Sequence, residues 1–177
     1  MFKHTNGILL RKLERVDLEL LMHLKNESWQ NTHQVSIVNM EDQLRWFDSL
    51  TSASTPNCPK QLVLIAETEN DKGHEVPVGV FKLFGIDWYS RRADAGWDIF
   101  AESRGKGLGK KLVQAGVDYC RFLLGLHRLR ADILVNNEAS IKCALAAGFV
   151  NEGREKEAVL KTGRYLDSLV FGNILDN

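Results

Sequence analysis

Glycines and basic side chains gather near the middle of the chain, in the run Glu-Ser-Arg-Gly-Lys-Gly-Leu-Gly-Lys-Lys at 102–111. An apolar alternating stretch at 95–100 precedes this run, and apolar residues spaced by three and four follow it. This order predicts a strand, a glycine loop and the start of a helix. Glycine lets the backbone approach a ligand closely, and the first N–H groups of a helix are unpaired donors at its positive end. The run is therefore a candidate anion-binding site.

The glycine spacing excludes two familiar phosphate loops. A Walker loop needs Ser or Thr after Gly-Lys, but Lys111 follows Gly109 and Lys110. A dinucleotide loop would need its third glycine where Lys110 stands. What remains is the pattern Arg-Gly-x-Gly-x-Gly over 104–109. The residues that we expect at the anion are Arg104, Gly105, Lys106, Gly107, Leu108, Gly109 and Lys110.

The composition is that of an ordinary globular protein, and we expect one domain over residues 1–177. The 23 basic residues balance the 23 acidic residues, so no net charge drives the chain toward nucleic acid or a membrane. The first residues lack the apolar core of a signal peptide, and no apolar run approaches the length of a membrane span. We therefore expect a cytoplasmic protein.

Metal, disulfide and hydrolase chemistry have no support in the sequence. The cysteines are Cys58, Cys120 and Cys143, an odd number without a C-x-x-C spacing. The five histidines share no motif with a Ser, Asp or Cys partner, so each is expected to be an ordinary surface or interface histidine. We expect no metal site.

Hydrophobic periodicity predicts helices and strands on both sides of the glycine loop. Helices are predicted at 16–25, 40–50, 107–124 and 138–147. Strands are predicted at 8–10, 61–68, 76–84, 94–100, 129–135, 149–160 and 164–174. This order predicts an α/β fold with a mixed sheet of six or seven strands and helices on both faces. The strand–helix–strand order around the loop predicts that 94–100 and 129–135 are parallel neighbours.

The loop and the element order resemble those of the GNAT acyltransferases. The pyrophosphate loop of that family has Gln or Arg, then glycine three positions on and glycine or alanine two further, as at Arg104, Gly107 and Gly109. The likeness is greatest to the RimJ/RimL-like branch, which places Asn-x-x-Ser at the start of a late helix, here Asn137 and Ser140. The branch's Gly-Phe and Gly-x-x-x-Asp patterns also match, at 148–149 and 163–167.

The resemblance implies a GNAT fold, acetyl-CoA as acyl donor and an amine as acceptor. In this family two central parallel strands splay apart to admit the thioester, and here they would be 94–100 and 129–135. The pantetheine arm would pair with the first of these strands, near Ile99 and Phe100. Asn137 and Ser140 would contact the same arm from the late helix.

Direct acyl transfer requires a base for the amine and a weak acid for the leaving thiolate. We expect Asp98 as the base, because it shares one strand face with Asp94 and lies two residues before the strand end. A solvated surface aspartate is the alternative. The resemblance gives Ser140 as the acid, with Tyr165 as a second candidate, although a serine there can simply satisfy the helix backbone. A backbone N–H near Ile99 would hold the oxyanion.

The acceptor pocket of this fold lies between the first two helices and the last hairpin, here 26–46 and 160–167. Candidate acceptor-binding residues are Glu27, Trp29, His33, Trp46 and Trp97. The sequence leaves three functions open: acetylation of a peptide N-terminus or small amine, acetylation of a nucleotide-linked amino sugar, and CoA binding without catalysis. A monomer and a homodimer are both compatible with the sequence.

Overall fold

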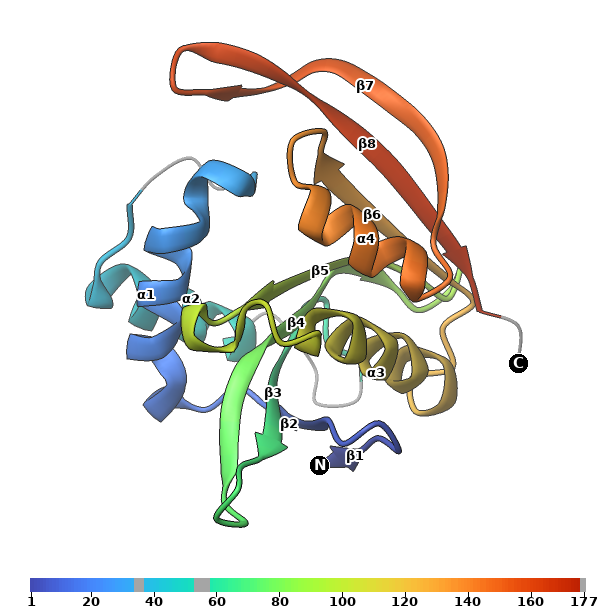
Figure 1. The fold of residues 1–177 in the computed structure, drawn as a ribbon. Helices are drawn as coiled ribbons and strands as arrows, with labels where there is room; N and C mark the ends of the chain where they lie inside the picture. Colours follow the sequence, from blue (N-terminus) through green and yellow to red (C-terminus); the bar gives the residue numbers. More distant parts are fainter. Residues whose placement is uncertain (34–36, 53–57, 176–177) are drawn as a thin grey trace.

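The computed structural model describes residues 1–33, 37–52 and 58–175, and these form one mixed sheet flanked by helices (Figure 1). The spatial order of the strands is β1-β2-β3-β4-β5-β6-β8-β7. The strands are β1 (Phe2–Lys3), β2 (Leu9–Lys12), β3 (Leu62–Glu69), β4 (Glu75–Asp87), β5 (Arg92–Ile99), β6 (Arg128–Leu134), β7 (Val150–Lys161) and β8 (Arg164–Ile174). The α-helices are α1 (Leu18–Ser28), α2 (Met40–Ser52), α3 (Leu108–Phe122) and α4 (Glu138–Ala146). Short 3-10 helices are η1 (Arg15–Asp17), η2 (Trp29–Asn31) and η3 (Ala101–Ser103).

The structure confirms the predicted fold class and corrects two details. The described sheet has eight strands instead of six or seven, because the two-residue β1 pairs with β2. Two residues are too few to show an alternating hydrophobic pattern, so the sequence could not reveal this strand. The first helix also continues past its predicted end at Lys25, through Ser28 and on into η2.

The two faces of the sheet carry different helices. Helices α3 and α4 pack on one face over a large core that includes Phe81, Leu112 and Leu129. Helices α1 and α2 cover part of the other face, where Leu21 and Val80 belong to a smaller cluster. Successive side chains of β4 point to opposite faces of the sheet, so Val80 and Phe81 contribute to different cores.

Helix α3 approaches the sheet very closely at Gly116. A Cβ atom at Gly116 would lie 2.4 Å from the ring of Phe81, so any larger residue would push the helix away from β4. The helix also begins close to α4, because a Cβ atom at Gly109 would lie 2.9 Å from the Sγ atom of Cys143. These contacts fix the position of the N-terminus of α3, where the glycine loop ends.

Strands β5 and β6 are parallel neighbours, as the sequence predicted. Their pairing covers only three residue pairs, from Arg92↔Arg128 to Asp94↔Arg130. Beyond this point β5 stays paired with β4 as far as Ile99, and β6 stays paired with β8 as far as Leu134. The two strands therefore diverge in the middle of the sheet, which confirms the predicted splay.

A buried ion-pair network attaches the start of α1 to the sheet. The Arg11 guanidinium donates to both Asp17 carboxylate oxygens, at 2.7 and 2.8 Å, and to Glu67 Oε1 at 2.9 Å. Asp17 also accepts the backbone N–H of Glu14 at 2.8 Å. Burial alone would raise the pKa of Asp17, but the hydrogen bonds from Arg11 and Glu14 outweigh burial and lower the pKa.

We predict that Asp17→Ala lowers the free energy of unfolding by about 3 kcal/mol, because it removes one of the two carboxylates that neutralise the partly buried Arg11 guanidinium. Since the folded-state pKa of Asp17 is lowered, its stabilisation is complete above the ordinary pKa of about 4 and disappears as the pH falls below it. Denaturant unfolding at pH 7 and pH 3 measures both effects. The exposed Asp71→Ala is the matched control. An unchanged unfolding midpoint for Asp17→Ala at pH 7 would contradict the prediction.

Candidate active site

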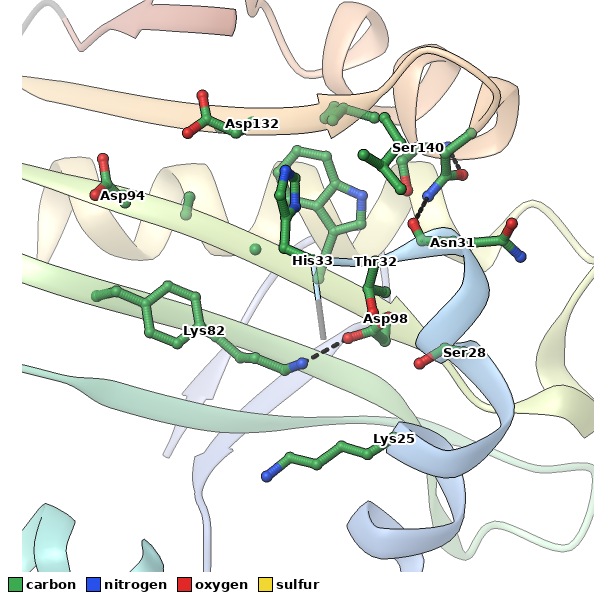
Figure 2. A pocket seen from close by; sticks show the side chains of 18 residues that line it. Lys25, Ser28, Asn31, Thr32, His33, Lys82, Asp94, Asp98, Asp132 and Ser140 are labelled. Carbon is green, nitrogen blue, oxygen red and sulfur yellow. Dashed lines mark hydrogen bonds and ion pairs between the residues drawn. The ribbon is translucent and has the colours of Figure 1, made fainter. Parts of the chain in front are cut away.

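A pocket opens where β5 and β6 diverge (Figure 2). Its volume is about 390 Å³, and it extends from the sheet surface to the loop that follows η2. Side chains of α1, β4, β5, β6 and the start of α4 line it together with that loop. The polar and aromatic residues that line it include Lys25, Asn31, His33, Lys82, Asp94, Trp97, Asp98, Asp132, Asn137 and Ser140.

Strand β5 presents two carboxylates to the pocket face. Asp94 and Asp98 lie on this face with Gly96 between them, as the strand alternation predicts. The Asp98 carboxylate accepts a hydrogen bond from Lys82 Nζ at 2.5 Å, so an ammonium balances its charge. Lys82 was not among the site residues predicted from the sequence, although a lysine within the apolar run of β4 could have indicated a functional role.

The backbone of β5 has free groups on the side of β6. Phe100 N–H donates to Val78 O on β4 at 3.0 Å. Because successive N–H groups of a strand point to opposite sides, the N–H of Ile99 points toward the gap between β5 and β6. The buried Nε1 of Trp97 also has no hydrogen-bond partner among the described residues. Such buried donors are rare in folded proteins and fit a polar ligand arm lying in the gap.

The glycine loop has the conformation of an anion cradle. Gly105 and Gly107 adopt φ angles of +75° and +74°, and no atom lies within 4 Å of a Cβ built on either residue. Gly107 is also the N-cap of α3, whose first turn carries no acidic side chain. Open space, left-handed backbone and unpaired helix N–H groups therefore coincide at one place. Lys106 lies exposed on this loop, Leu108 begins α3, and Lys110 lies exposed in the first turn of α3.

Arg104 links the glycine loop to two other elements. Its Nε donates to Ile99 O at 3.1 Å, which joins the loop to the end of β5. Its terminal nitrogen lies 3.7 Å from Glu27 Oε2 on α1. Both side chains of this ion pair are about half exposed, so it contributes little stability. It does show that Glu27 faces the glycine loop and does not line the pocket.

Asn137 uses both ends of its side-chain amide. Its Oδ1 accepts the backbone N–H of Ser140 at 3.2 Å and so caps α4. Its Nδ2 donates to Asn31 O at the end of η2, at 3.0 Å (Figure 2). Ser140 lines the pocket one turn into α4. The same amide thus holds together the start of α4 and the wall formed by η2.

A second contact anchors η2 to the last hairpin. Lys161, at the end of β7, is 5% exposed, and its Nζ donates to Trp29 O at 2.6 Å. The β7–β8 hairpin arches past the end of β6 to reach this position (Figure 1). The ammonium lies at the C-terminal end of α1 and η2, where unpaired carbonyls and the helix dipole favour a cation. No sequence motif marked Lys161 in advance.

Besides Glu27, three predicted acceptor-binding or catalytic residues lie outside the pocket. Tyr165 on β8 is 63% exposed, so the structure does not bring it to Ser140. Trp46 belongs to the smaller core, where the Nζ of Lys25 lies 3.9 Å from its ring centroid. Trp29 contributes its carbonyl and its ring to Lys161, not to the pocket lining.

Lys25 is a further pocket residue that the sequence reading missed. Its Nζ donates to the buried Gln43 Oε1 at 2.9 Å and lies over Trp46. Burial, followed by the nearby charge of Lys82, lowers the pKa of Lys25 to about 8. The pocket thus has a cationic side formed by Lys25 and an acidic side formed by Asp94 and Asp132.

The described residues offer neither a metal site nor a membrane-spanning helix. Within residues 1–33, 37–52 and 58–175, no group of three His, Cys, Asp or Glu side chains is placed to hold a metal ion. In the same ranges, no helix has the length and apolar character needed to span a membrane.

Proteins of known function resemble this chain over most of its length. A spermidine N(1)-acetyltransferase of Vibrio cholerae is 27% identical over 167 residues, which cover 92% of this chain and 90% of the relative. The L-amino acid N-acyltransferase MnaT of Escherichia coli is 28% identical over 130 residues, 73% of this chain and 70% of the relative. A crystal structure of spermidine N-acetyltransferase from Vibrio cholerae in complex with CoA and spermine has the same fold. Its TM-score is 0.86 at 22% identity, over 97% of both chains.

The model of the acetyltransferase (GNAT) domain matches residues 8–150. This range includes the divergence of β5 and β6, the glycine loop and the start of α4. It covers more than half of the chain, so the protein belongs to the GNAT family and is an acetyl-CoA-dependent N-acetyltransferase.

Proposed function

We propose that the enzyme acetylates a primary amine of a small aliphatic molecule, with polyamines of the spermidine type as its acceptors. The observation that carries this proposal is the acidic side of the pocket. Asp94 and Asp132 extend from neighbouring strands into it (Figure 2). Asp94 makes no ion pair with any described residue, so its carboxylate can receive a ligand ammonium. Burial raises the pKa of Asp94, and a bound cation would favour its charged form.

The relatives support the same acceptor class. Spermidine N(1)-acetyltransferases of Vibrio cholerae and Escherichia coli match 92% and 93% of this chain. The solved Vibrio cholerae enzyme holds CoA and spermine. Neither a peptide N-terminus nor a nucleotide-linked amino sugar receives comparable support from the relatives. The RimJ/RimL-like assignment, the oligomeric state and a cytoplasmic location stay predictions.

The geometry supports direct transfer within the splay. The pyrophosphate of acetyl-CoA would lie on the loop from Arg104 to Lys110, and its pantetheine arm would run beside β5 toward Ser140. The acceptor amine would attack the thioester carbonyl from the side of η2. The N–H of Ile99 would stabilise the oxyanion, and the Ser140 hydroxyl would protonate the departing thiolate. The base that the sequence predicts is Asp98, which lines this pocket and is paired with Lys82.

An amino acid is a second acceptor class, favoured by one observation. Lys25 lines the pocket, and its ammonium, which donates to Gln43, is a charge that could attract the carboxylate of an amino acid. The similarity to an L-amino acid N-acyltransferase agrees with this possibility. The two classes make opposite demands on the pocket, because a polyamine needs the carboxylates and an amino acid needs Lys25.

A panel of amines separates these acceptors. We expect spermidine and spermine to release free thiol from acetyl-CoA with a kcat/KM at least about tenfold above that of amino acids, a difference of about 1.4 kcal/mol. The panel also includes short peptides, nucleotide-linked amino sugars and simple monoamines. Faster turnover of an amino acid than of every polyamine would overturn the proposed acceptor.

Two carboxylate variants test the acidic side of the pocket. We predict that Asp94→Asn raises the KM for spermidine about tenfold, because it removes a counter-charge for a ligand ammonium. Asp132→Asn should raise it less, because the Asp132 carboxylate already pairs with Arg130. The KM for acetyl-CoA should not change. Asp71→Asn, in the exposed turn between β3 and β4, is the control for loss of one negative charge. Equal KM values for all three variants would remove the support that these carboxylates give.

A glycine variant tests the cradle for acetyl-CoA. We predict that Gly107→Val weakens acetyl-CoA binding more than about tenfold, because a branched side chain would occupy the space of the pyrophosphate. Gly125→Val is the matched control, since Gly125 also has a positive φ, +63°, and open space around a Cβ. Calorimetry on both folded variants measures the difference. If Gly107→Val binds acetyl-CoA as tightly as Gly125→Val does, the pyrophosphate lies elsewhere.

A further inference from the structure

We infer that His33 is the group that takes the proton from the acceptor amine. The inference rests on the proposed transfer within the splay and concerns a residue that the sequence places among the candidate acceptor-binding residues. His33 follows η2, and its imidazole lines the pocket together with Trp97 and Ser140 (Figure 2). No other imidazole lines this pocket within the described residues.

Contacts on both sides of His33 fix its position. Two residues before it, Asn31 O accepts from Asn137, whose other end caps α4 at Ser140. Four residues before it, Trp29 O accepts from the buried Lys161. These hydrogen bonds hold the segment that carries His33 against the start of α4 and the last hairpin. The imidazole therefore lies on the acceptor side of the splay at the level of Ser140.

One ring nitrogen is engaged and the other is available. His33 Nε2 lies 3.4 Å from Oγ of Ser168, a side chain that is 1% exposed. The opposite nitrogen has no hydrogen-bond partner among the described residues. When Nε2–H donates to Ser168, the lone pair of Nδ1 is free to accept a proton. A buried hydroxyl that orients the imidazole is the arrangement expected of a positioned base.

The charges around His33 suit a neutral imidazole. Burial lowers its pKa, Asp132 and Glu155 oppose this effect, and Lys161 adds to it, so the net direction is down. A lowered pKa leaves His33 unprotonated at neutral pH, as a base must be. The remaining ionisable groups of the pocket are Lys25, Lys82, Asp94 and Asp98.

Asp98 is less suited to this role, because it is already paired. Its carboxylate accepts from Lys82 at 2.5 Å, and both side chains are largely buried. Protonation of Asp98 would leave the Lys82 ammonium buried without a counter-charge, which is costly. We therefore assign Asp98 and Lys82 to the structure of the pocket floor and proton removal to His33.

The acceptor ammonium first loses one proton to solvent. The neutral amine nitrogen then attacks the thioester carbonyl carbon, a C–N bond forms, and one N–H proton passes to the free nitrogen of His33, directly or through one water. The tetrahedral intermediate then collapses, the C–S bond breaks, and the thiolate takes a proton from Ser140. Ser140 regains a proton from solvent, and His33 releases its proton to solvent. The products are the N-acetylated amine, CoA and one proton for each protonated amine that enters.

The pH profile of kcat/KM tests the assignment, with the panel amine that turns over fastest as acceptor. The wild type should show two ionisations on the acid side, one from the acceptor amine and one from His33. We expect His33→Gln to lower kcat by about 10²–10⁴-fold, to lose the second ionisation, and to keep the KM for acetyl-CoA. Asp98→Asn should keep that ionisation. His23→Gln, on the exposed side of α1, is the matched control and should behave as the wild type.

Chemical rescue distinguishes a role of His33 in proton transfer from a purely structural role. Imidazole in solution should restore part of the rate of His33→Ala and should not accelerate the wild type. A His33→Gln enzyme with full kcat and both ionisations would overturn the assignment, as would loss of the second ionisation in Asp98→Asn alone. Poor turnover of polyamines beside good turnover of another amine would overturn only the proposed acceptor, and the test of His33 would still stand.

Discussion

The separation of β5 from β6 is the constraint on which the site depends. Each strand stays paired along its outer edge, β5 with β4 and β6 with β8, while their facing edges pair over only three residues. Backbone N–H and C=O groups inside a sheet are costly when they lack partners. A gap lined by such groups, with the unpaired Nε1 of Trp97 beside it, favours an extended ligand that carries amides.

The two halves of the chain meet around this gap. The C-terminal half supplies Asn137 and Lys161, which bind the carbonyls of η2 from two directions. The glycine loop reaches α1 through the ion pair of Arg104 with Glu27. The pocket wall formed by η2, on the acceptor side, is therefore attached to the same elements that would bind acetyl-CoA. The positions of the amine and the thioester would consequently depend on one another. The affinity for each substrate thus depends on contacts made far apart in the sequence.

Local signals predicted most of the fold and the donor half of the site. The hydrophobic periods gave the element order, and the glycine spacing at the start of α3 gave the loop, because both depend on neighbours in the chain. The acceptor half was harder to predict. Lys82 contacts Asp98 on the neighbouring strand, 16 positions away in the chain, and Lys161 contacts Trp29 across 132 positions, so no local pattern predicts which residues pair. His33 is a candidate acceptor-binding residue by sequence, and its contact with Ser168 could not be predicted because it exists only in the folded chain.

A crystal structure of the enzyme with CoA and spermidine would test the central claim most directly, which is that the donor arm occupies the gap between β5 and β6. The account predicts pantetheine amides paired with the backbone of Trp97 and Ile99, the pyrophosphate on the N-terminus of α3, and the acceptor amine between His33 and the thiol. CoA bound outside the gap, or β5 and β6 fully paired beyond Asp94, would contradict it.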